Sequence, residues 1–301
     1  MAAVMGPPQP TRMTASTEAA ASAVAASTGT PRVVRPPARS PQRAGRSSPR
    51  GLLLLSATGI VLFFCIWQGL AWSGWIQPRY LPGPLTVVET LGHLATTPYS
   101  GATLWGHLGA SLVRFGVGFA LAAAVGIPLG LLMGWYRWLD NIVHPFFEAL
   151  RFVAPIAWVP FAGLWFGTGI GGPTLVIFSG AFAPCLINAY RGAKYVDRRL
   201  IEAARTLGAN GPRIVLEVLL PASVPAIVAG LRISAGIGWQ SLIGAELIVV
   251  ASGIGYMMVQ AQLNVETPIV MAGMVAIGVV GVLIDFLLRL LEAAAQRHRR
   301  H

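Results

Sequence analysis

The sequence carries little charge and almost no cysteine. Of its 301 residues, 11% are charged and 54% are apolar, whereas soluble domains carry about 25% charged residues. The mean hydropathy is +0.64, so the chain cannot cover itself with an ordinary polar surface, which excludes a single soluble domain. Its two cysteines exclude a disulfide scaffold, a cysteine-rich zinc module and an iron–sulfur cluster. Both Cys65 and Cys185 lie in apolar stretches and are interpreted as small buried hydrophobic residues.

Motifs that bind nucleotides or metals are also missing. The chain has no P-loop lysine motif, so we expect it not to bind ATP by itself. The stretch GTGIGG at 167–172 matches a dinucleotide-binding pattern, but no strand pattern precedes it and no acidic residue follows at the required spacing. The five histidines do not show metal-ligand spacing. We therefore expect no enzymatic activity, no catalytic residue, no metal site and no cofactor.

Positive charge is concentrated at the ends of the chain and in short loops. The first 50 residues hold seven arginines against one acid, Glu18, and the remaining 251 residues carry +5 of the net +11. This distribution is typical of a membrane protein rather than of a nucleic-acid-binding face, so no nucleic acid partner is expected. Residues 1–50 have no apolar periodicity and predict a disordered basic tail. The alternative is an arm that contacts anionic lipid head groups.

Six long apolar blocks follow the tail, at about 52–72, 112–134, 144–166, 173–190, 222–250 and 268–288. A helix needs about 20 residues to cross about 30 Å of hydrocarbon, and backbone groups in lipid must be paired within their own segment. The sequence therefore predicts an all-α polytopic membrane protein with six transmembrane helices in one domain over residues 51–301. Pro145, Pro155 and Pro160 interrupt the third block and predict kinks there.

The orientation follows from the lysines and arginines. With the N-terminus inside and alternating spans, 18 of the 22 basic residues fall on the cytoplasmic side and only Arg79 falls outside. Six spans then bring both termini to the cytoplasm. The long outer loop at 73–100 contains a short helical pattern at the membrane interface. The residues expected on its apolar face are Leu85, Val88, Leu91 and Leu94.

The cytoplasmic loop at about 193–221 has the pattern of two short amphipathic helices. Asp197 can cap a first helix over 198–207, and Gly208 supplies the left-handed residue that ends it. Its apolar stripe consists of Leu200, Ile201, Ala204 and Leu207. The second helix is expected over 212–219, ending before Pro221. The stripe must pack on something, which is either a partner protein, the chain's own bundle or the lipid interface.

This loop resembles the signature loop of importer-type ABC transporter permeases. The family pattern is E-A-A, three residues, G, nine residues and I-x-L-P. The chain has Glu202-Ala203-Ala204, Gly208 and Val218-Leu219-Leu220-Pro221, with valine in place of isoleucine. The resemblance extends over about 80–290 and is closest to the branch that imports nitrate, taurine and aliphatic sulfonates. The stretches that carry it are LPGP, ALRFVAPIAWVPFAGLWFG, GLRISAGIGWQSLIGAELI and GIGYMMVQAQ.

The resemblance implies a permease subunit in the inner membrane that docks through this loop onto a cytoplasmic ATPase. It implies two such ATPases, a solute-binding protein outside the cell and a second permease copy, most simply in a homodimer. The residues assigned to ATPase coupling are Glu202, Ala203, Ala204, Leu207, Gly208 and Pro221. Glu202 offers an exposed anion to the partner, and the two alanines permit close approach.

Charged residues also occur inside or at the edge of the apolar blocks, where they usually face the bundle interior or a cavity. Glu148 and Arg151 are three residues apart and can meet on one helix face. Arg232 and Glu246 are fourteen residues apart, about 21 Å along a helix, so each needs a partner from elsewhere.

The residues predicted to line the translocation path are Arg151, Arg232, Trp239, Gln240 and Glu246. The substrate expected from the family branch is a small anion such as a sulfonate, taurine or nitrate, and the alternative within the family is a neutral or heterocyclic solute. A rival class is an ion-coupled secondary transporter that works without an ATPase and uses Arg232 and Glu246 as a coupling pair.

Overall fold

A computed structural model describes residues 49–77, 79–248 and 250–297. The chain divides into two units, residues 1–59 and 60–301, and in the first only the helical residues 49–59 are described. The predicted disordered tail therefore lies, up to residue 48, outside the described residues, whereas Pro49 already belongs to a helix. The expected division into a tail and one transmembrane domain stays a prediction.

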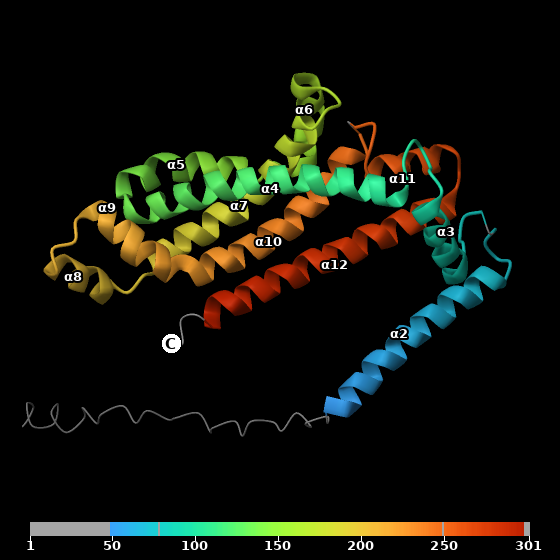
Figure 1. The fold of residues 1–301 in the computed structure, drawn as a ribbon, viewed down its shortest axis with the longest axis horizontal. Helices are drawn as coiled ribbons and strands as arrows, with labels where there is room; N and C mark the ends of the chain where they lie inside the picture. Colours follow the sequence, from blue (N-terminus) through green and yellow to red (C-terminus); the bar gives the residue numbers. More distant parts are fainter. Residues whose placement is uncertain (1–48, 78, 249, 298–301) are drawn as a thin grey trace, which may run out of the picture. The chain divides into compact units, whose positions relative to one another are not determined.

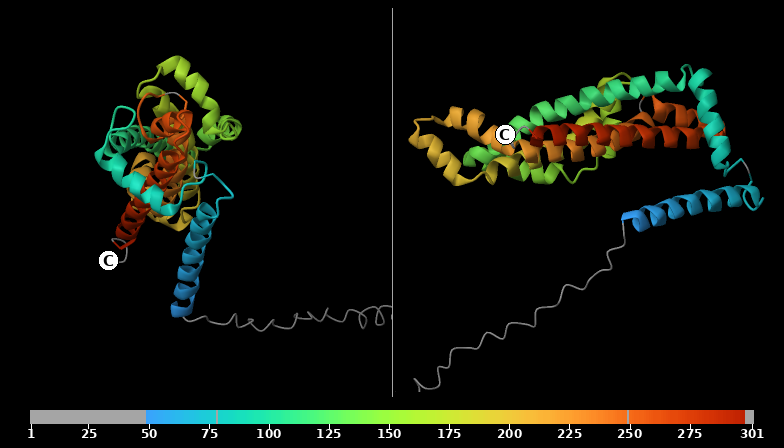
Figure 2. Two further views of the ribbon diagram at one scale, coloured as in Figure 1. Left: turned by 90° about the vertical axis from the view of Figure 1, so that its right-hand side faces the viewer. Right: turned by 60° about the horizontal axis from the view of Figure 1, so that its bottom comes forward.

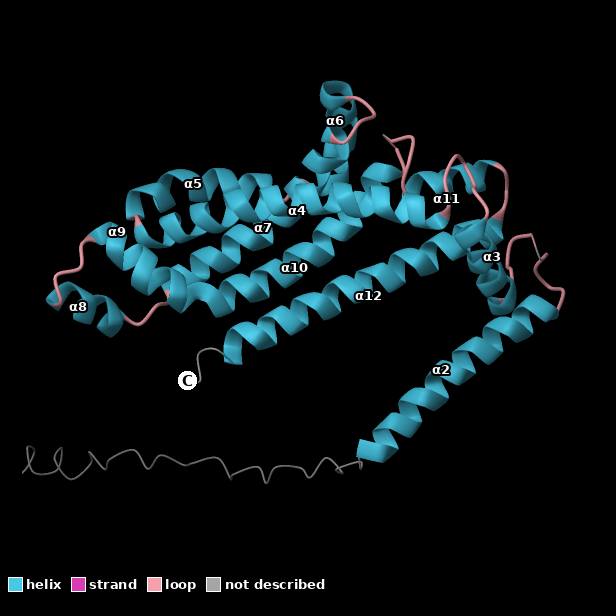
Figure 3. Cartoon of the chain, viewed as in Figure 1, coloured by secondary structure: helices cyan, strands magenta, loops and turns pink. Residues whose placement is uncertain are grey.

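Every regular element of the described residues is helical, and loops lie only between helices (Figure 3). In chain order the elements are α2 (Pro49–Trp72), α3 (Pro84–Thr96), α4 (Leu104–Trp135), α5 (Arg137–Leu150), η1 (Pro155–Trp158), α6 (Val159–Phe166), α7 (Gly171–Lys194), α8 (Arg198–Thr206), α9 (Gly211–Ile214), η2 (Val215–Leu219), α10 (Leu220–Glu246), α11 (Ile254–Leu263) and α12 (Thr267–Arg297). The predicted all-α class is confirmed.

Five helical stretches of the described chain are long and apolar enough to cross a membrane. They lie in α2, α4, α7, the continuous segment Gly211–Glu246, and α12. A sixth is formed only if α5 and the pair η1–α6 are counted together, and these meet at a bend of 87°. The expected third span is therefore a broken one. The break falls at residues 151–154, just before Pro155, because the residue preceding a proline is driven out of the helical region.

Helices α4, α7, α10 and α12 run side by side in unit 60–301, and α6 projects away from them (Figures 1 and 2). Small residues allow α4 and α7 to approach closely. A Cβ atom placed on Gly118 would lie 2.7 Å from Cβ of Ile177. One placed on Gly130 would lie 2.9 Å from Cβ of Ala189 and would also meet the carbonyl oxygen of Leu186. Larger side chains at these positions would separate the two helices.

The second loop helix was expected to end before Pro221, but the helix continues through this residue. Helix α9, the π-helical turn η2 and α10 follow one another as a single stretch, Gly211–Glu246. The backbone N–H of Leu220 donates to the carbonyl oxygen of Val215, five residues back. Pro221 lies directly after this π-helical turn, at the second residue of α10. The proline is thus accommodated by a wide turn instead of ending the helix.

The two ends of the bundle carry different short helices. Helices α8 and α9 lie at the end where α12 finishes, and α3 and α11 lie at the opposite end (Figures 1 and 2). The apolar face expected for α3 was partly wrong. Val87, Leu94 and the half-buried Leu91 pack inward, whereas Leu85 and Val88 are exposed. The inward face consists of Val87, Leu91 and Leu94, which are spaced by four and three residues as one face of a helix requires. It therefore begins at Val87 and not at Leu85.

Candidate functional site

The loop with the family signature forms a short capped helix, α8, at one end of the bundle (Figure 1). Oδ1 of Asp197 accepts a hydrogen bond from the backbone N–H of Arg199 at 3.0 Å. Gly208 has a φ of +83°. The N–H of Ala209, the residue after it, donates to the carbonyl oxygen of Ala204 at 3.0 Å, which is the arrangement that closes a helix with a left-handed residue. The predicted cap at Asp197 and stop at Gly208 are confirmed.

The apolar side chains of this helix are only partly covered by the rest of the described chain: Leu200 and Leu207 are exposed, whereas Ile201 and Ala204 are half-buried. No residue of α8 is buried, and Leu207, directly after it, is 87% exposed. A groove of about 740 Å³ separates α8 from the segment that leads into α10, and it is lined by residues that include Ala203, Ala204, Leu207, Glu217 and Val218. Glu202 is exposed on the same helix. The helical bundle therefore leaves part of the apolar stripe uncovered. An amphipathic helix that binds another protein needs such an uncovered surface.

The segment after Gly208 is stiffened by local bonds. Oδ1 of Asn210 accepts a hydrogen bond from the backbone N–H of Arg213 at 3.3 Å and caps α9. The guanidinium of Arg213 then pairs with the carboxylate of Glu217 one turn later, at 2.9 Å. Pro221 is exposed at the start of α10. The Asn210 cap joins the turn after α8 to the segment Gly211–Glu246, and the pair Arg213–Glu217 lies within that segment.

Arg232 does not pair with Glu246. Its Nε lies 2.5 Å from Oδ1 of Asp285 on α12, and its Nη1 lies 3.9 Å from Oε2 of Glu292. Asp285 is shared with Arg289, whose Nε lies 2.7 Å from Oδ2. All of these residues are at least partly exposed to solvent in the isolated chain. Arg232 therefore joins α10 to the last turns of α12 through an acidic pair of side chains that neutralises its charge.

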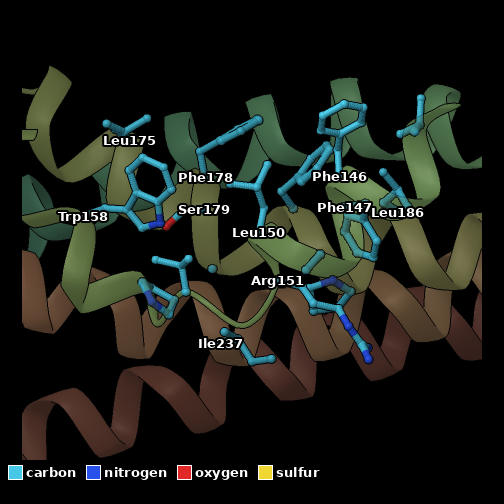
Figure 4. A pocket seen from close by; sticks show the side chains of 17 residues that line it. Phe146, Phe147, Leu150, Arg151, Trp158, Leu175, Phe178, Ser179, Leu186 and Ile237 are labelled. Carbon is cyan, nitrogen blue, oxygen red and sulfur yellow. The ribbon is translucent and has the colours of Figure 1, made fainter. Parts of the chain in front are cut away.

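Arg151 lies at the break between α5 and η1. Its Nε pairs with Oε2 of Glu148 at 2.9 Å, as predicted from their spacing. Its guanidinium carbon also lies 4.9 Å from the centre of the Phe152 ring. Figure 4 shows Arg151 at the edge of an apolar cavity of about 410 Å³ between α5, η1 and α7. Aromatic side chains that include Phe147 and Trp158 form much of its wall.

Trp239 and Gln240 occupy different faces of α10. Trp239 is buried, packs edge-on against Phe115 with ring centres 5.5 Å apart, and donates from Nε1 to the carbonyl oxygen of Ile277 at 3.2 Å. Gln240 is exposed. The exposed residues Ile233 and Ile237 precede it at helical spacing, so this face of α10 is open in the isolated chain.

Glu246, the last residue of α10, is buried together with Arg114 of α4. Nη1 of Arg114 lies 3.0 Å from Oε1 of Glu246, and the hydroxyl of Ser111 donates to the same carboxylate at 2.8 Å. Glu246 lies too far along the helix from Arg232 to pair with it, and its partner is Arg114 from another helix, α4. It does not face an open surface of the chain.

The sequence did not predict that Glu246 pairs with Arg114, and it did not indicate the polar residues around them. His107, Ser111 and Arg114 recur at spacings of four and three, which places them on one face of α4. That pattern was the available signal. Ser252, whose hydroxyl bonds to Arg114, and helix α11 had no comparable signal.

The described residues contain no group of three or more His, Cys, Asp or Glu side chains arranged to hold a metal ion. The candidate site has three parts: the exposed amphipathic helix α8, the long helix α10 with an open face that includes Ile233, Ile237 and Gln240, and the buried ion pair at the far end of α10.

Known proteins share both the sequence and the fold. Residues 126–300 match the family described as binding-protein-dependent transport system inner membrane component. The taurine transport system permease protein TauC of Escherichia coli is 36% identical over 239 residues, which cover 79% of this chain and 87% of TauC. The bicarbonate transport system permease protein CmpB of Synechococcus elongatus is 36% identical over 267 residues, which cover 82% of this chain and 94% of CmpB.

A solved structure of the methionine ABC transporter MetNI in an inward-facing conformation resembles 64% of this chain. The TM-score is 0.52, the sequence identity is 21%, and the match covers 94% of the other chain. At that identity the likeness concerns the fold.

Proposed function

Since the chain belongs to the family of binding-protein-dependent transport inner membrane components, which are ABC importer permeases, we propose that it is the membrane subunit of an ATP-driven importer of small anions. The observation that carries this proposal is the exposed, capped helix α8, which displays an apolar stripe that the described chain leaves partly uncovered. The chain has no nucleotide-binding lysine motif of its own, so the ATPase is a separate protein.

The ATPase docks on α8. Ala203 and Ala204 present no bulk, Leu207 offers an exposed apolar side chain, and Glu202 offers an anion to a basic residue of the partner. Gly208 fixes the angle at which the docking helix meets the next segment because its positive φ suits glycine.

Movement of the docked ATPase reaches the path through one continuous helical segment. Gly211–Glu246 contains 36 residues, which corresponds to about 54 Å at 1.5 Å per residue. The Asn210 cap and the pair Arg213–Glu217 stiffen the start of this segment, which follows α8 after a turn at residues 207–210. A shift of α8 therefore displaces the cytoplasmic end of α10.

The translocation path runs along the open face of α10. Gln240 and Arg232 lie on or beside that face, and Arg151 lies at the edge of the neighbouring cavity. Trp239 and Glu246, the other predicted path residues, support the path from behind because both are buried. A second copy of the chain, in a homodimer, closes the open face.

The substrate is a small anion. Support comes from relatives whose names specify taurine and bicarbonate. Arg151 and Arg232, each paired with a carboxylate, are the cationic groups near the open face that an anion could meet. An extracytoplasmic binding protein delivers the substrate, and two ATPase copies bind on the cytoplasmic side. The positive-inside count favours a cytoplasmic position for both termini, and the last described turns of α12 lie at the same end of the bundle as α8.

The proposal is tested by purifying the chain from its native membrane in mild detergent, as wild type and as three variants. Wild type is expected to copurify with an ATPase. Glu202→Lys, which reverses the docking charge, and Gly208→Pro, which removes the left-handed stop, are expected to lose it. Gly208→Asn is the matched control, because asparagine tolerates positive φ and a Cβ at position 208 meets no atom within 4 Å. Copurification of no ATPase with wild type would favour the ion-coupled transporter.

A further inference from the structure

The polar network at the end of α10 joins the neighbouring helix α11 and helix α4, which is distant in the sequence. Oε1 of Glu246 accepts from Nη1 of Arg114 on α4, and Oε2 accepts from the backbone N–H of Gly255 in the first turn of α11 at 3.1 Å. The hydroxyl of Ser111 lies 2.8 Å from both oxygens. One carboxylate at the end of α10 thus holds α4 and also caps the N-terminus of α11, where a negative charge is favourable.

The same face of α4 also holds the turn before α11. Nη1 of Arg114 donates to the carbonyl oxygen of Ser252 at 2.9 Å, and its Nη2 bonds to the Ser252 hydroxyl. Nδ1 of His107 accepts from the backbone N–H of Gly253 at 3.2 Å. The other ring nitrogen therefore carries the proton that is donated to the carbonyl oxygen of Tyr99 at 2.9 Å.

The backbone at Gly253 and Gly255 packs directly against Glu246, which leaves no space for a side chain at either position. Gly253 has a φ of +108°, and a Cβ atom there would lie 2.5 Å from Cδ of Glu246. A Cβ atom on Gly255 would lie 2.6 Å from Cβ of Glu246. The two glycines let the backbone of α11 close around the carboxylate, so the end of α10 is fixed by backbone as well as by side chains.

Stability alone does not account for such an arrangement. A buried ion pair gains little over well-packed apolar residues of similar volume, because desolvation offsets the attraction of the two charges. What the pair supplies is a directional connection between helices. It lies at the end of the Gly211–Glu246 segment that is farthest from α8, where the ATPase is proposed to dock.

We infer that Arg114 and Glu246 are positioning residues that anchor the far end of α10, so that displacement of α8 tilts α10 about this point. Without the anchor α10 would slide or rotate as a whole. ATP hydrolysis would then no longer tilt the open face of α10, and substrate would not be moved. This inference rests on the proposed function. It assigns the coupling between hydrolysis and transport to a pair of residues that touch neither ATP nor substrate.

The test uses the complete transporter with its ATPase and binding protein, reconstituted in vesicles. Arg114→Met and Glu246→Met are introduced together, because the double change removes both charges while keeping similar volumes. The double variant is expected to copurify with the ATPase and to hydrolyse ATP at a rate within about twofold of wild type. Taurine taken up per ATP hydrolysed is expected to fall at least tenfold. Ser223→Ala, which alters a buried and unpaired hydroxyl of the same helix, is expected to change neither value.

A second measurement does not depend on the folding of that variant. In a background without Cys65 and Cys185, spin labels at positions 109 and 263 report the distance between α4 and α11, and labels at 216 and 291 report the α8 end of the bundle. Trapping the ATPase with bound nucleotide is expected to change the second distance by several ångströms and to leave the first unchanged.

Two results would overturn the inference: uptake per ATP that is unchanged in a folded double variant, or a 109–263 distance that moves as much as the 216–291 distance. Absence of ATP-dependent uptake by wild type would overturn the proposed function instead, and this inference with it.

Discussion

Glu246 and Arg114, 132 residues apart in the chain, form a buried ion pair of 3.0 Å that joins the end of α10 to α4. The pair lies at the end of α10 that is farther from α8. The long helix therefore follows the exposed helix α8 at one end and is joined to the core of the chain at the other.

Removing one partner of this pair is expected to destabilise the chain more than removing both. Arg114→Met leaves the carboxylate of Glu246 buried without its cation, which costs about 3–5 kcal/mol. The double variant to methionine leaves no such charge and is expected to lose much less. Thermal unfolding of the purified chain in detergent measures both. Equal losses in the single and double variants would contradict this account.

Close packing of α4 on α7 depends on glycine at position 130. Gly130→Val would drive a side chain into the backbone of α7 at Leu186 and is expected to cost about 1–3 kcal/mol. Gly116→Ala on the same helix is the matched control, because a Cβ there meets no atom within 4 Å. That control is expected to be neutral or slightly stabilising, since alanine favours helix. The unfolding temperature of each variant decides the comparison, and equal shifts would argue against the packing described.

If Arg232 contacts an anionic substrate, as proposed, the carboxylate of Asp285 competes with that substrate for it. Asp285→Asn removes that competitor and is expected to lower the KM for taurine. Arg232→Gln removes a charged hydrogen-bond donor, a contribution of about 1.5–3 kcal/mol, and is expected to raise the KM about tenfold or more. Initial rates of uptake over a range of substrate concentrations give both values. If KM is unchanged in both variants, Arg232 does not meet the substrate and serves only to join α10 to α12.

The open face of α10 is expected to contact water during transport. In a background without native cysteines, Gln240→Cys is expected to react with a charged, membrane-impermeant thiol reagent, and saturating substrate is expected to slow the reaction. Leu242→Cys is the control because that side chain is fully buried two residues along the same helix. Reaction of the control as fast as Gln240→Cys would mean that the labelling does not report the path.

The helices were predictable from the sequence wherever one physical constraint, such as the pairing of backbone groups in lipid, determines the secondary structure. Apolar runs of about 20 residues must be helical in lipid, and α2, α4, α7, α10 and α12 follow from that rule. The cap at Asp197 and the stop at Gly208 also depend only on local chemistry. The family was predicted from Glu202, Gly208 and Pro221 together with their spacing, and the comparisons confirm it.

Features that depend on tertiary structure were not predictable in the same way. Pro221 looked like a helix end, because nothing local to it indicates that the turn at 215–219 widens to accept a proline. The pairing of Arg114 with Glu246 depends on how α4 and α10 pack, which periodicity within one helix does not determine. The assignments of the coupling and path residues stay predictions, and transport experiments must test them.

The central claim is that this chain imports its substrate with energy from a separate ATPase. The most direct measurement is uptake of radiolabelled taurine, bicarbonate or nitrate into vesicles that contain the chain and its copurified ATPase, with ATP inside and the binding protein outside. Uptake of at least one of these anions is expected to require ATP, to persist when ion gradients are collapsed, and to be lost in Gly208→Pro but not in Gly208→Asn. Uptake that proceeds without ATP and stops when the ion gradient is collapsed would contradict the account.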